Sequence, residues 1–270
     1  MSDFDQPADF LAESEALAGL LEPLGDADFE RPTQFKTYRV HDVVAHLHIF
    51  NWAADLSMRD AEGFGAWWKP FAAGVMKGRT LPELTDEWLE GARGRVVFER
   101  WRDFLPGMAE RFAAADPRAR VPWAGPSMSV RSSITARLME TWAHGQELYD
   151  LLGVERKDGD RIRNIAHLGI NTFGWTFANR GEEPPGPVPR VRLTAPSGAI
   201  WEWNADNASD SVEGSATEFC QVVTQTRNVA DTDLVVRGPV ALRWMSVAQC
   251  FAGGVEDPPP PGARHTVVQS

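Results

Sequence analysis

The stretch RLMETWAHGQEL, residues 137–148, decides the fold, because it is strongly helical and carries two candidate metal ligands on one face. Glu140 and His144 are four positions apart, and at about 3.6 residues per turn they project from the same side of a helix, one turn apart. This spacing suits two ligands of one cation. A Glu–His pair with the same spacing also occurs on solvent-exposed helix faces, so the pair alone leaves both interpretations open.

The rest of this helix face is typical of a cavity wall. Small and polar side chains lie along it, and apolar residues cover much of the remaining circumference. The small and polar positions are Ser133, Ala136, Arg137 and Glu147. Solvent exposure of the whole face is the competing interpretation.

A second predicted helix, residues 41–59, supplies a third candidate ligand. His46 and His48 lie about 200° apart around such a helix, so they cannot face the same way. His46 shares its side with Val43, Ile49, Phe50 and Ala53, whereas His48 shares its side with Asn51, Asp55 and Arg59. We therefore expect His46 to point inward and His48 outward. A hydrogen-bonded core histidine is the alternative role for His46.

The side chains of His46, Glu140 and His144 form a mixed nitrogen and oxygen donor set. Such a set suits zinc, with nickel or ferrous iron as alternatives. Three protein ligands leave one coordination position for water or substrate, as in catalytic zinc sites, whereas structural zinc sites are closed by four ligands. Ligands on helices converge in the core of a bundle.

Helical periodicity extends over the first two thirds of the chain. Long helices are predicted at residues 9–24, 41–59, 81–115 and 129–152, and a fifth at residues 160–179. The Gly- and Trp-rich segment GFGAWWKPFAAG, residues 63–74, is interpreted as a connection between the second and third helices. This order predicts an up-down helical bundle over residues 1–180.

A change of pattern marks a second domain. The proline-rich segment GEEPPGPVP, residues 181–189, suits a linker. A small α+β domain is expected over residues 190–256. It contains a hairpin (RVRLTAP and AIWEWNA around Pro196-Ser197-Gly198), a helix at 217–226, a strand at 234–237 and a helix at 240–251. Residues 257–270, with four consecutive prolines, are expected to form a disordered tail.

The bulk composition excludes some function classes. The chain has 270 residues and a formal net charge of −11, which argues against a nucleic-acid partner because such binding needs a basic surface. Neither a secretory signal nor a membrane span is visible, so we expect a cytoplasmic protein. Cys220 and Cys250 lie in no metal or redox motif and are expected to be buried core residues.

Two motifs resemble a known family. YRVHDVVAHLHIFNWAADL, residues 38–56, resembles the W-[ST]-V-x-D-V-[VL]-A-H-L signature of mycothiol-dependent maleylpyruvate isomerase-like proteins, and RLMETWAHGQELYDLLG, residues 137–153, resembles their E-x-x-x-H motif. VRGPVALRWMSVAQCFAG, residues 236–253, is similar to their closing strand–helix unit. Tyr38 and Arg39 depart from the signature, where the family usually has Trp and a Ser or Thr.

The resemblance implies a fold and a metal site. The family belongs to the DinB-like superfamily of metal-binding bundles, so the fold class is mainly α: a DinB-like up-down four-helix bundle followed by a small α+β C-terminal domain. The family's zinc-binding His falls on His46, and its Glu and His fall on Glu140 and His144. These are the residues already selected from the helix faces.

The resemblance also implies two kinds of chemistry. In one, mycothiol or another low-molecular-weight thiol binds the metal, ionises, and serves an isomerase or a thiol transferase acting on a small, anionic, unsaturated or carbonyl-containing substrate. In the other, the metal activates water for hydrolysis, hydration or lyase chemistry, including hydrolysis of an acyl thioester. A non-catalytic metal- or small-molecule-binding protein is the third interpretation. We expect a monomer or homodimer with no nucleic-acid or membrane partner.

Further residues are candidates for substrate binding or positioning. Arg137, one turn before Glu140, and Arg243, after the Gly-Pro turn, could bind an anionic substrate, and a surface or interdomain salt bridge is the alternative for each. Asp42 could accept a hydrogen bond from His46 and so orient its ring, or could stabilise the start of the second helix.

Overall fold

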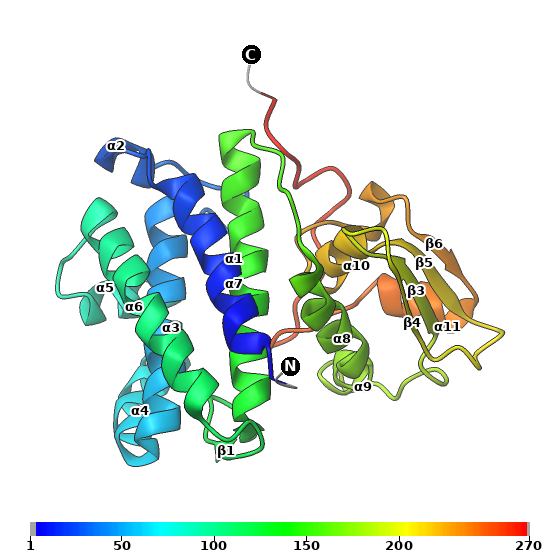
Figure 1. The fold of residues 1–270 in the computed structure, drawn as a ribbon, viewed down its shortest axis with the longest axis horizontal. Coiled ribbons are helices and arrows are strands. Elements are labelled where there is room, and N and C mark those ends of the chain that lie inside the picture. The colour runs from blue at the N-terminus through cyan, green and yellow to red at the C-terminus, as the bar shows by residue number, and fades with distance from the viewer. Residues whose placement is uncertain (1–3, 269–270) are drawn as a thin grey trace. The chain divides into compact units, whose positions relative to one another are not determined.

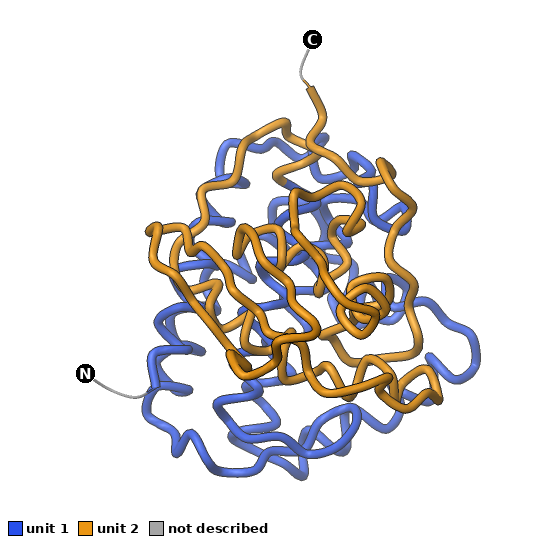
Figure 2. The backbone as a smooth tube through the Cα atoms, turned by 90° about the vertical axis from the view of Figure 1, so that its right-hand side faces the viewer, with its two compact units in different colours: residues 1–148 blue, residues 149–270 orange. Residues whose placement is uncertain are grey.

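The computed structural model describes residues 4–268. The chain forms two compact units, residues 1–148 and residues 149–270, which Figure 2 shows in different colours. The first unit is helical and the second contains helices and a small sheet. This architecture confirms the predicted fold class, a helical bundle followed by a small α+β region.

Four long helices build the bundle (Figure 1): α1 (Gln6–Leu21), α3 (Val40–Arg59), α6 (Gly94–Ala114) and α7 (Val130–Leu152). The short helix α2 (Asp26–Phe29) follows α1, and a two-stranded ribbon of β1 (Arg120–Val121) and β2 (Met128–Ser129) precedes α7. Helix α6 packs against both α1 and α3. Fully buried apolar side chains, including Phe10, Phe98 and Trp101, fill the core between these helices.

The segment predicted to be a connection is instead a helix, α4 (Ala61–Met76), which packs on α3. Asp60 caps it by accepting a hydrogen bond from the Gly63 backbone N–H at 2.8 Å. Its aromatic residues Phe64, Trp67, Trp68 and Phe71 recur at helical spacing and form ring contacts with one another. Burial of this aromatic face outweighs the cost of three glycines and Pro70 in the helix.

The single long helix expected at residues 81–115 is two helices, α5 (Leu81–Trp88) and α6. The chain turns between them, and Glu90, Gly91 and Gly94 all have positive φ angles there. Those conformations are incompatible with a continuous right-handed helix. The break allows both α5 and α6 to pack on α3.

The second unit begins earlier than the boundary expected at the proline-rich segment. After α7 come a 3-10 turn η1 (Asp160–Ile162), α8 (Arg163–Asn171) and α9 (Phe173–Ala178), so the predicted fifth helix is interrupted. Helix α8 packs against α10 (Ala216–Val223) of the same unit, which is why contacts group it with the α+β region.

A four-stranded sheet of order β4-β3-β5-β6 forms the centre of this unit. Strands β3 (Arg190–Thr194) and β4 (Ile200–Trp203) form the predicted antiparallel hairpin. The unexpected strand β5 (Ser211–Ser215) runs parallel to β3 and pairs with β6 (Val235–Arg237). Helix α11 (Pro239–Met245) follows β6, and Trp244 of α11 packs on Phe219 of α10 with ring centroids 5.8 Å apart.

The segment expected to be a disordered tail is ordered over the part that the structure describes. The Asn228 side chain, at the start of the 3-10 turn η2 (Val229–Asp231), donates to the Pro259 carbonyl oxygen at 2.8 Å. The Thr266 hydroxyl donates to the Asp150 carboxylate at 3.0 Å, and the Val267 N–H donates to the Asp150 carbonyl oxygen at 2.9 Å. Asp150 in turn binds Arg227, so the tail ends on a buried ion pair.

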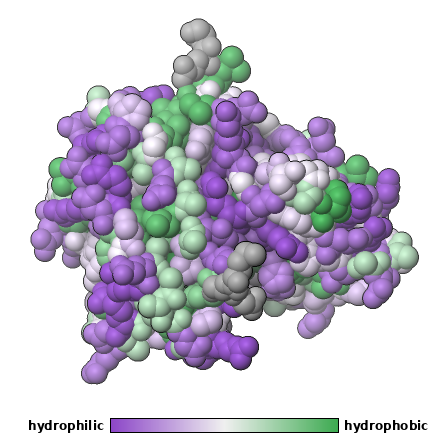
Figure 3. All heavy atoms as spheres, in the orientation of Figure 1, coloured by the Kyte–Doolittle hydropathy of each residue, from purple (hydrophilic) through white to green (hydrophobic). Residues whose placement is uncertain are grey.

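None of the described helices combines the length and the apolar character that a membrane crossing requires. Figure 3 shows one face of the molecule, on which hydrophilic residues are interspersed with smaller apolar patches. Among the residues described, the most exposed large apolar side chains are Met76, at the end of α4, and Val268, near the C-terminal end of the described chain.

Candidate metal centre

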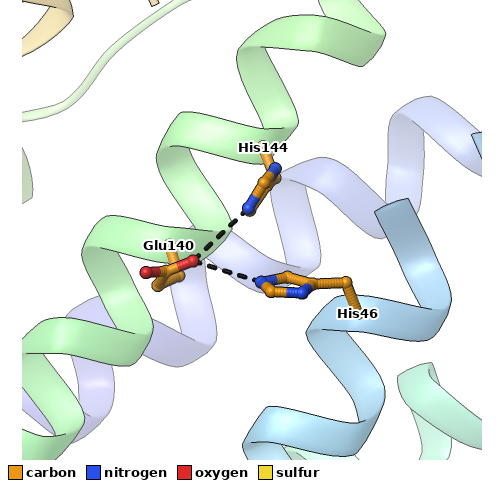
Figure 4. Close-up of side chains that lie close together, drawn as sticks. All are labelled: His46, Glu140 and His144. Atoms are coloured by element: carbon orange, nitrogen blue, oxygen red, sulfur yellow. Dashed lines mark hydrogen bonds and ion pairs between the residues drawn. The ribbon is translucent and has the colours of Figure 1, made fainter. Parts of the chain in front are cut away.

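Three side chains from two helices converge inside the bundle. His46 projects from α3, while Glu140 and His144 project from successive turns of α7, and all three point toward one another (Figure 4). One ligand atom from each side chain can be chosen so that all of these atoms lie within 4.8 Å of one another. The structure therefore brings together the three residues predicted as metal ligands.

The distances fit the geometry of a small divalent cation. The Glu140 Oε2 atom lies 3.3 Å from His46 Nε2 and 3.4 Å from His144 Nε2. A tetrahedral zinc ion with bonds of about 2.0–2.1 Å holds its ligand atoms about 3.3–3.4 Å apart. The carboxylate is thus spaced from each imidazole as two ligands of one ion would be.

The local charge state also suits a cation. Burial lowers the pKa of His46 to about 4, and the nearby charges of His144 and Arg137 lower it as well. The hydrogen bond with Glu140 raises this pKa but does not offset these effects. Burial would raise the pKa of Glu140, but hydrogen bonds from His144 and His46 and the charge of Arg137 hold it well below its usual value. At neutral pH the site offers a neutral His46 imidazole and a carboxylate, the forms that bind metal.

Aromatic rings cover both histidines. Phe50, one turn along α3, lies against His46 with ring centroids 4.7 Å apart, and Phe35 lies edge-on to His144 at 5.2 Å. The side chains of His46, Glu140 and His144 remain 14%, 22% and 13% exposed. The centre is therefore largely dry but retains access to solvent.

A narrow cleft reaches the centre beside His46. Its wall consists of Tyr38, residues of α3 and residues of α5: Asp42, Ala45, His46, Leu81, Pro82, Thr85 and Asp86. The cleft has no room for a water-sized sphere, so a ligand that approaches His46 through this cleft needs side chains in its wall to move. Burial, together with the charges of Asp42 and Glu140, raises the pKa of Tyr38 to about 12, so its hydroxyl keeps its proton at neutral pH.

Of the three further predicted site residues, Arg137 is buried on α7, and Asp42 and Arg243 have different surroundings. Asp42 accepts hydrogen bonds from the Arg39 N–H at 2.8 Å and from the Arg39 guanidinium at 3.1 Å, which favours its role at the start of α3. The Nδ1 atom of His46 is buried with no hydrogen-bond partner among the described residues, so Asp42 does not orient this ring. Arg243 lies in the second unit, where its exposed guanidinium binds both carboxylate oxygens of Glu182 at 2.8 Å.

His48 does not point to solvent as expected. It is buried, and its ring packs edge-on against Trp88 at 5.3 Å and Phe104 at 6.0 Å. Helix α3 is contacted by α4, α5 and α6, so its polar side also lies inside the protein. For the same reason Asn51 is fully buried, although the polar residues around it in the sequence indicate a solvent-facing side of the helix.

Comparison with known proteins identifies the family. Residues 10–149 match the family model described as the mycothiol maleylpyruvate isomerase N-terminal domain, and this range includes all three converging side chains. Curated relatives from two strains of Mycobacterium tuberculosis, each described as an uncharacterized protein, are 34% identical over 255 residues, or 94% of this chain and 96% of theirs.

Solved structures agree on the fold. The crystal structures of the mycothiol-dependent maleylpyruvate isomerase and of a histidine-to-alanine mutant of that enzyme each match with a TM-score of 0.53. Each match is 14% identical and covers 82% of this chain and 91% of the solved one, so this likeness concerns the fold alone. Together with the match over residues 10–149, it leads to one conclusion: this chain belongs to the mycothiol maleylpyruvate isomerase N-terminal domain family.

Proposed function

We propose that this protein is an enzyme in which His46, Glu140 and His144 hold one divalent cation, with zinc the preferred ion and nickel or ferrous iron as alternatives. The observation that carries this proposal is the spacing of the three ligand atoms, which come from helices α3 and α7 and lie within 4.8 Å of one another. Three protein ligands leave a position for a reactant, which is the arrangement of catalytic zinc sites.

The reaction that family membership favours is the isomerisation of a small, anionic, unsaturated carbonyl compound with mycothiol or a similar thiol as co-substrate. The bound cation would supply a Lewis acid that lowers the pKa of a coordinated thiol. The thiolate sulfur would add to one carbon of the conjugated double bond, and the electron pair of that bond would move to the carbonyl oxygen to give an enolate. The remaining single bond would rotate, and collapse of the enolate would expel the thiolate and restore the double bond in the other geometry.

The chain's own residues support such a reaction in three ways. Phe35 and Phe50 shield the imidazoles and limit the access of water. Glu140 holds negative charge where the cation binds. Tyr38 lines the cleft beside His46 with a hydroxyl that stays protonated, so it is suited to donate a hydrogen bond to an oxygen that gains charge.

The same centre supports other chemistry. With the thiol displacing a leaving group, the enzyme would be a thiol transferase. With water at the open position, it would be a hydrolase, hydratase or lyase. If the ion only stabilises the fold, its removal abolishes the melting transition. If the site is catalytic, its removal abolishes turnover and leaves a folded protein.

Cobalt substitution tests the proposal directly. The protein is loaded with Co²⁺ and titrated with mycothiol, then with 2-mercaptoethanol as a simpler thiol, while the absorption spectrum is recorded. We expect one cobalt ion per chain and a sulfur-to-cobalt charge-transfer band that grows with thiol. His46→Ala should show neither, and His167→Ala, which alters an exposed histidine of α8, should show both. A wild-type protein that binds cobalt without any thiol-dependent band would refute thiol activation.

A further inference from the structure

Arg137 is a buried cation with an unused hydrogen-bond donor. Its residue is 4% exposed, and its Nε–H donates to the Asn51 Oδ1 atom at 2.9 Å. The Nη2 atom is also buried and has no partner among the described residues. An unpaired donor on a buried guanidinium is costly, because neither water nor protein replaces its hydration. Within residues 4–268, nothing therefore serves as an acceptor for this Nη2 atom.

Asn51 adds a second unused donor to the same place. The residue is fully buried on α3, and its amide oxygen is already occupied by Arg137. Arginine has only donors, so the amide oxygen must face it and the orientation of the amide group is settled. The Nδ2 atom is left buried and without a partner among the described residues. Arg137 and Asn51 thus offer N–H groups from two helices that are held together by their own hydrogen bond.

The charge balance points to an anion. The negative charge of Glu140 stabilises the charged form of Arg137 from a distance. No described carboxylate contacts this guanidinium closely enough to form an ion pair. Glu140 is also a ligand of the proposed cation. With that cation bound and both histidines neutral, the charges of the cation, Glu140 and Arg137 add to a surplus of two positive charges. A thiolate neutralises one of them, and a second anion is needed for the other.

Phe50 links this pair to the metal centre. Its ring lies 4.7 Å from the His46 ring, and the Arg137 Cζ atom lies 5.9 Å from the Phe50 centroid. Arg137 also precedes Glu140 by one turn of α7. The Phe50 ring also lies 6.4 Å from the Trp123 ring and 6.1 Å from the Phe71 ring, measured between ring centroids. An anion at Arg137 would therefore lie beside the reacting group and against an aromatic wall.

We infer that Arg137 and Asn51 form a carboxylate-binding site beside the metal centre, and that the substrate carries a carboxylate next to a flat, apolar body. The planar guanidinium presents its N–H groups in the geometry that carboxylates accept, with the Asn51 amide as an additional donor. The inference rests on the proposed function, because the metal takes Glu140 and leaves Arg137 without a counter-charge.

Binding measurements test this site without any turnover. The zinc-loaded protein is saturated with 2-mercaptoethanol, which occupies the metal's open position, and is titrated calorimetrically in chloride-free buffer. The probes are acetate, butyrate and benzoate, each compared with its neutral amide of nearly equal shape. We expect at least one acid to bind ten times more tightly than its amide, because hydrogen bonds to charged groups contribute most to affinity.

Two variants and a control locate the effect. Asn51→Asp places a carboxylate against Arg137 at almost unchanged volume, so it should keep or raise the melting temperature and lower the affinity for the acid at least tenfold. Arg137→Met should lose the preference for the acid altogether. Arg131→Met removes the same charge from α7 six residues earlier and should leave the preference unchanged.

The outcomes separate the two proposals. Equal binding of acids and amides by wild type would mean that water satisfies the donors, and would overturn the carboxylate site. A preference for the acid that persists in Asn51→Asp would also overturn the carboxylate site. This result is decisive even if Arg137→Met fails to fold. A thiol-dependent cobalt band without acid preference refutes this site alone. Acid preference without that band refutes thiol activation alone.

Discussion

Loss of one imidazole should abolish the response of the protein's stability to zinc. His46 is the proposed ligand on α3, whereas the other two proposed ligands, Glu140 and His144, both lie on α7. His46→Ala leaves two ligands on a single helix, so the ion can no longer link the two helices. The fold should survive this change, because its core consists of buried apolar residues such as Phe98 and Trp101.

The expected shift follows from binding linkage. Zinc at a free concentration one hundred times its dissociation constant stabilises the native state by about 2.7 kcal/mol. Unfolding entropy is about 2.1 cal/mol/K per residue, or about 0.3 kcal/mol/K for the 148 residues of the bundle unit. The melting temperature should therefore rise by about 9 °C if this unit melts separately, and by about 5 °C if the whole chain melts in one transition.

Differential scanning calorimetry of metal-free protein with and without zinc measures this shift. Wild type and His167→Ala should show the full rise, whereas His46→Ala and Glu140→Gln should shift by less than about 1 °C, because weak residual binding contributes little. Elemental analysis of the same samples should give one zinc per chain only where the shift is present. An equal shift in wild type and His46→Ala would show that zinc binds elsewhere, and the reasoning from the three ligands would be wrong.

Three further predictions concern stability and reactivity in the second unit. Asp150→Ala should lower the free energy of unfolding, measured by urea titration, by about 3–5 kcal/mol. The two terminal nitrogens of Arg227 each donate to Asp150 at 2.7 Å, and the substitution leaves this guanidinium buried without its partner. As a control, Glu182→Ala breaks an exposed ion pair and should lower the free energy of unfolding by less than about 1 kcal/mol. Burial raises the pKa of Cys220 well above its usual value, so this thiol should resist iodoacetamide at pH 8 until urea unfolds the chain, and fast native labelling at this position would contradict its burial. Gly238→Ala should lower the free energy of unfolding by about 1–3 kcal/mol or more, because the φ angle is 87° and an added Cβ would collide with neighbouring backbone and side-chain oxygens. An unchanged melting temperature would show that this turn can relax.

The candidate ligands could be predicted from the sequence, because the spacing of two residues along a helix determines the sides from which their side chains project. Glu140 and His144 had to share a face of any helix that contained them, and the apolar neighbours of His46 indicated that it points inward. The hairpin around Gly198 was accessible for a similar reason, since alternating residues and a turn define local pairing.

Longer-range features needed the folded chain. Residues 63–74 contain glycines and a proline, so their local preference is against a helix, and only the packing of their aromatic rings against α3 reverses it. Strand β5 has one apolar residue, Val212, and becomes a strand because β3 and β6 flank it. The prediction that His48 points outward was wrong, because α5 and α6 cover that side of α3.

Residue order along single helices was enough to select His46, Glu140 and His144 and to indicate a helical bundle, because both inferences depend only on helical periodicity. The partner of Arg137 could not be found in this way. Asn51 lies 86 positions before Arg137, on a different helix, and its side looked solvent-facing in isolation. Only the packing of α3 among its neighbours buries that side. Burial is what turns an ordinary asparagine and arginine into an unsatisfied pair of donors beside the proposed metal centre.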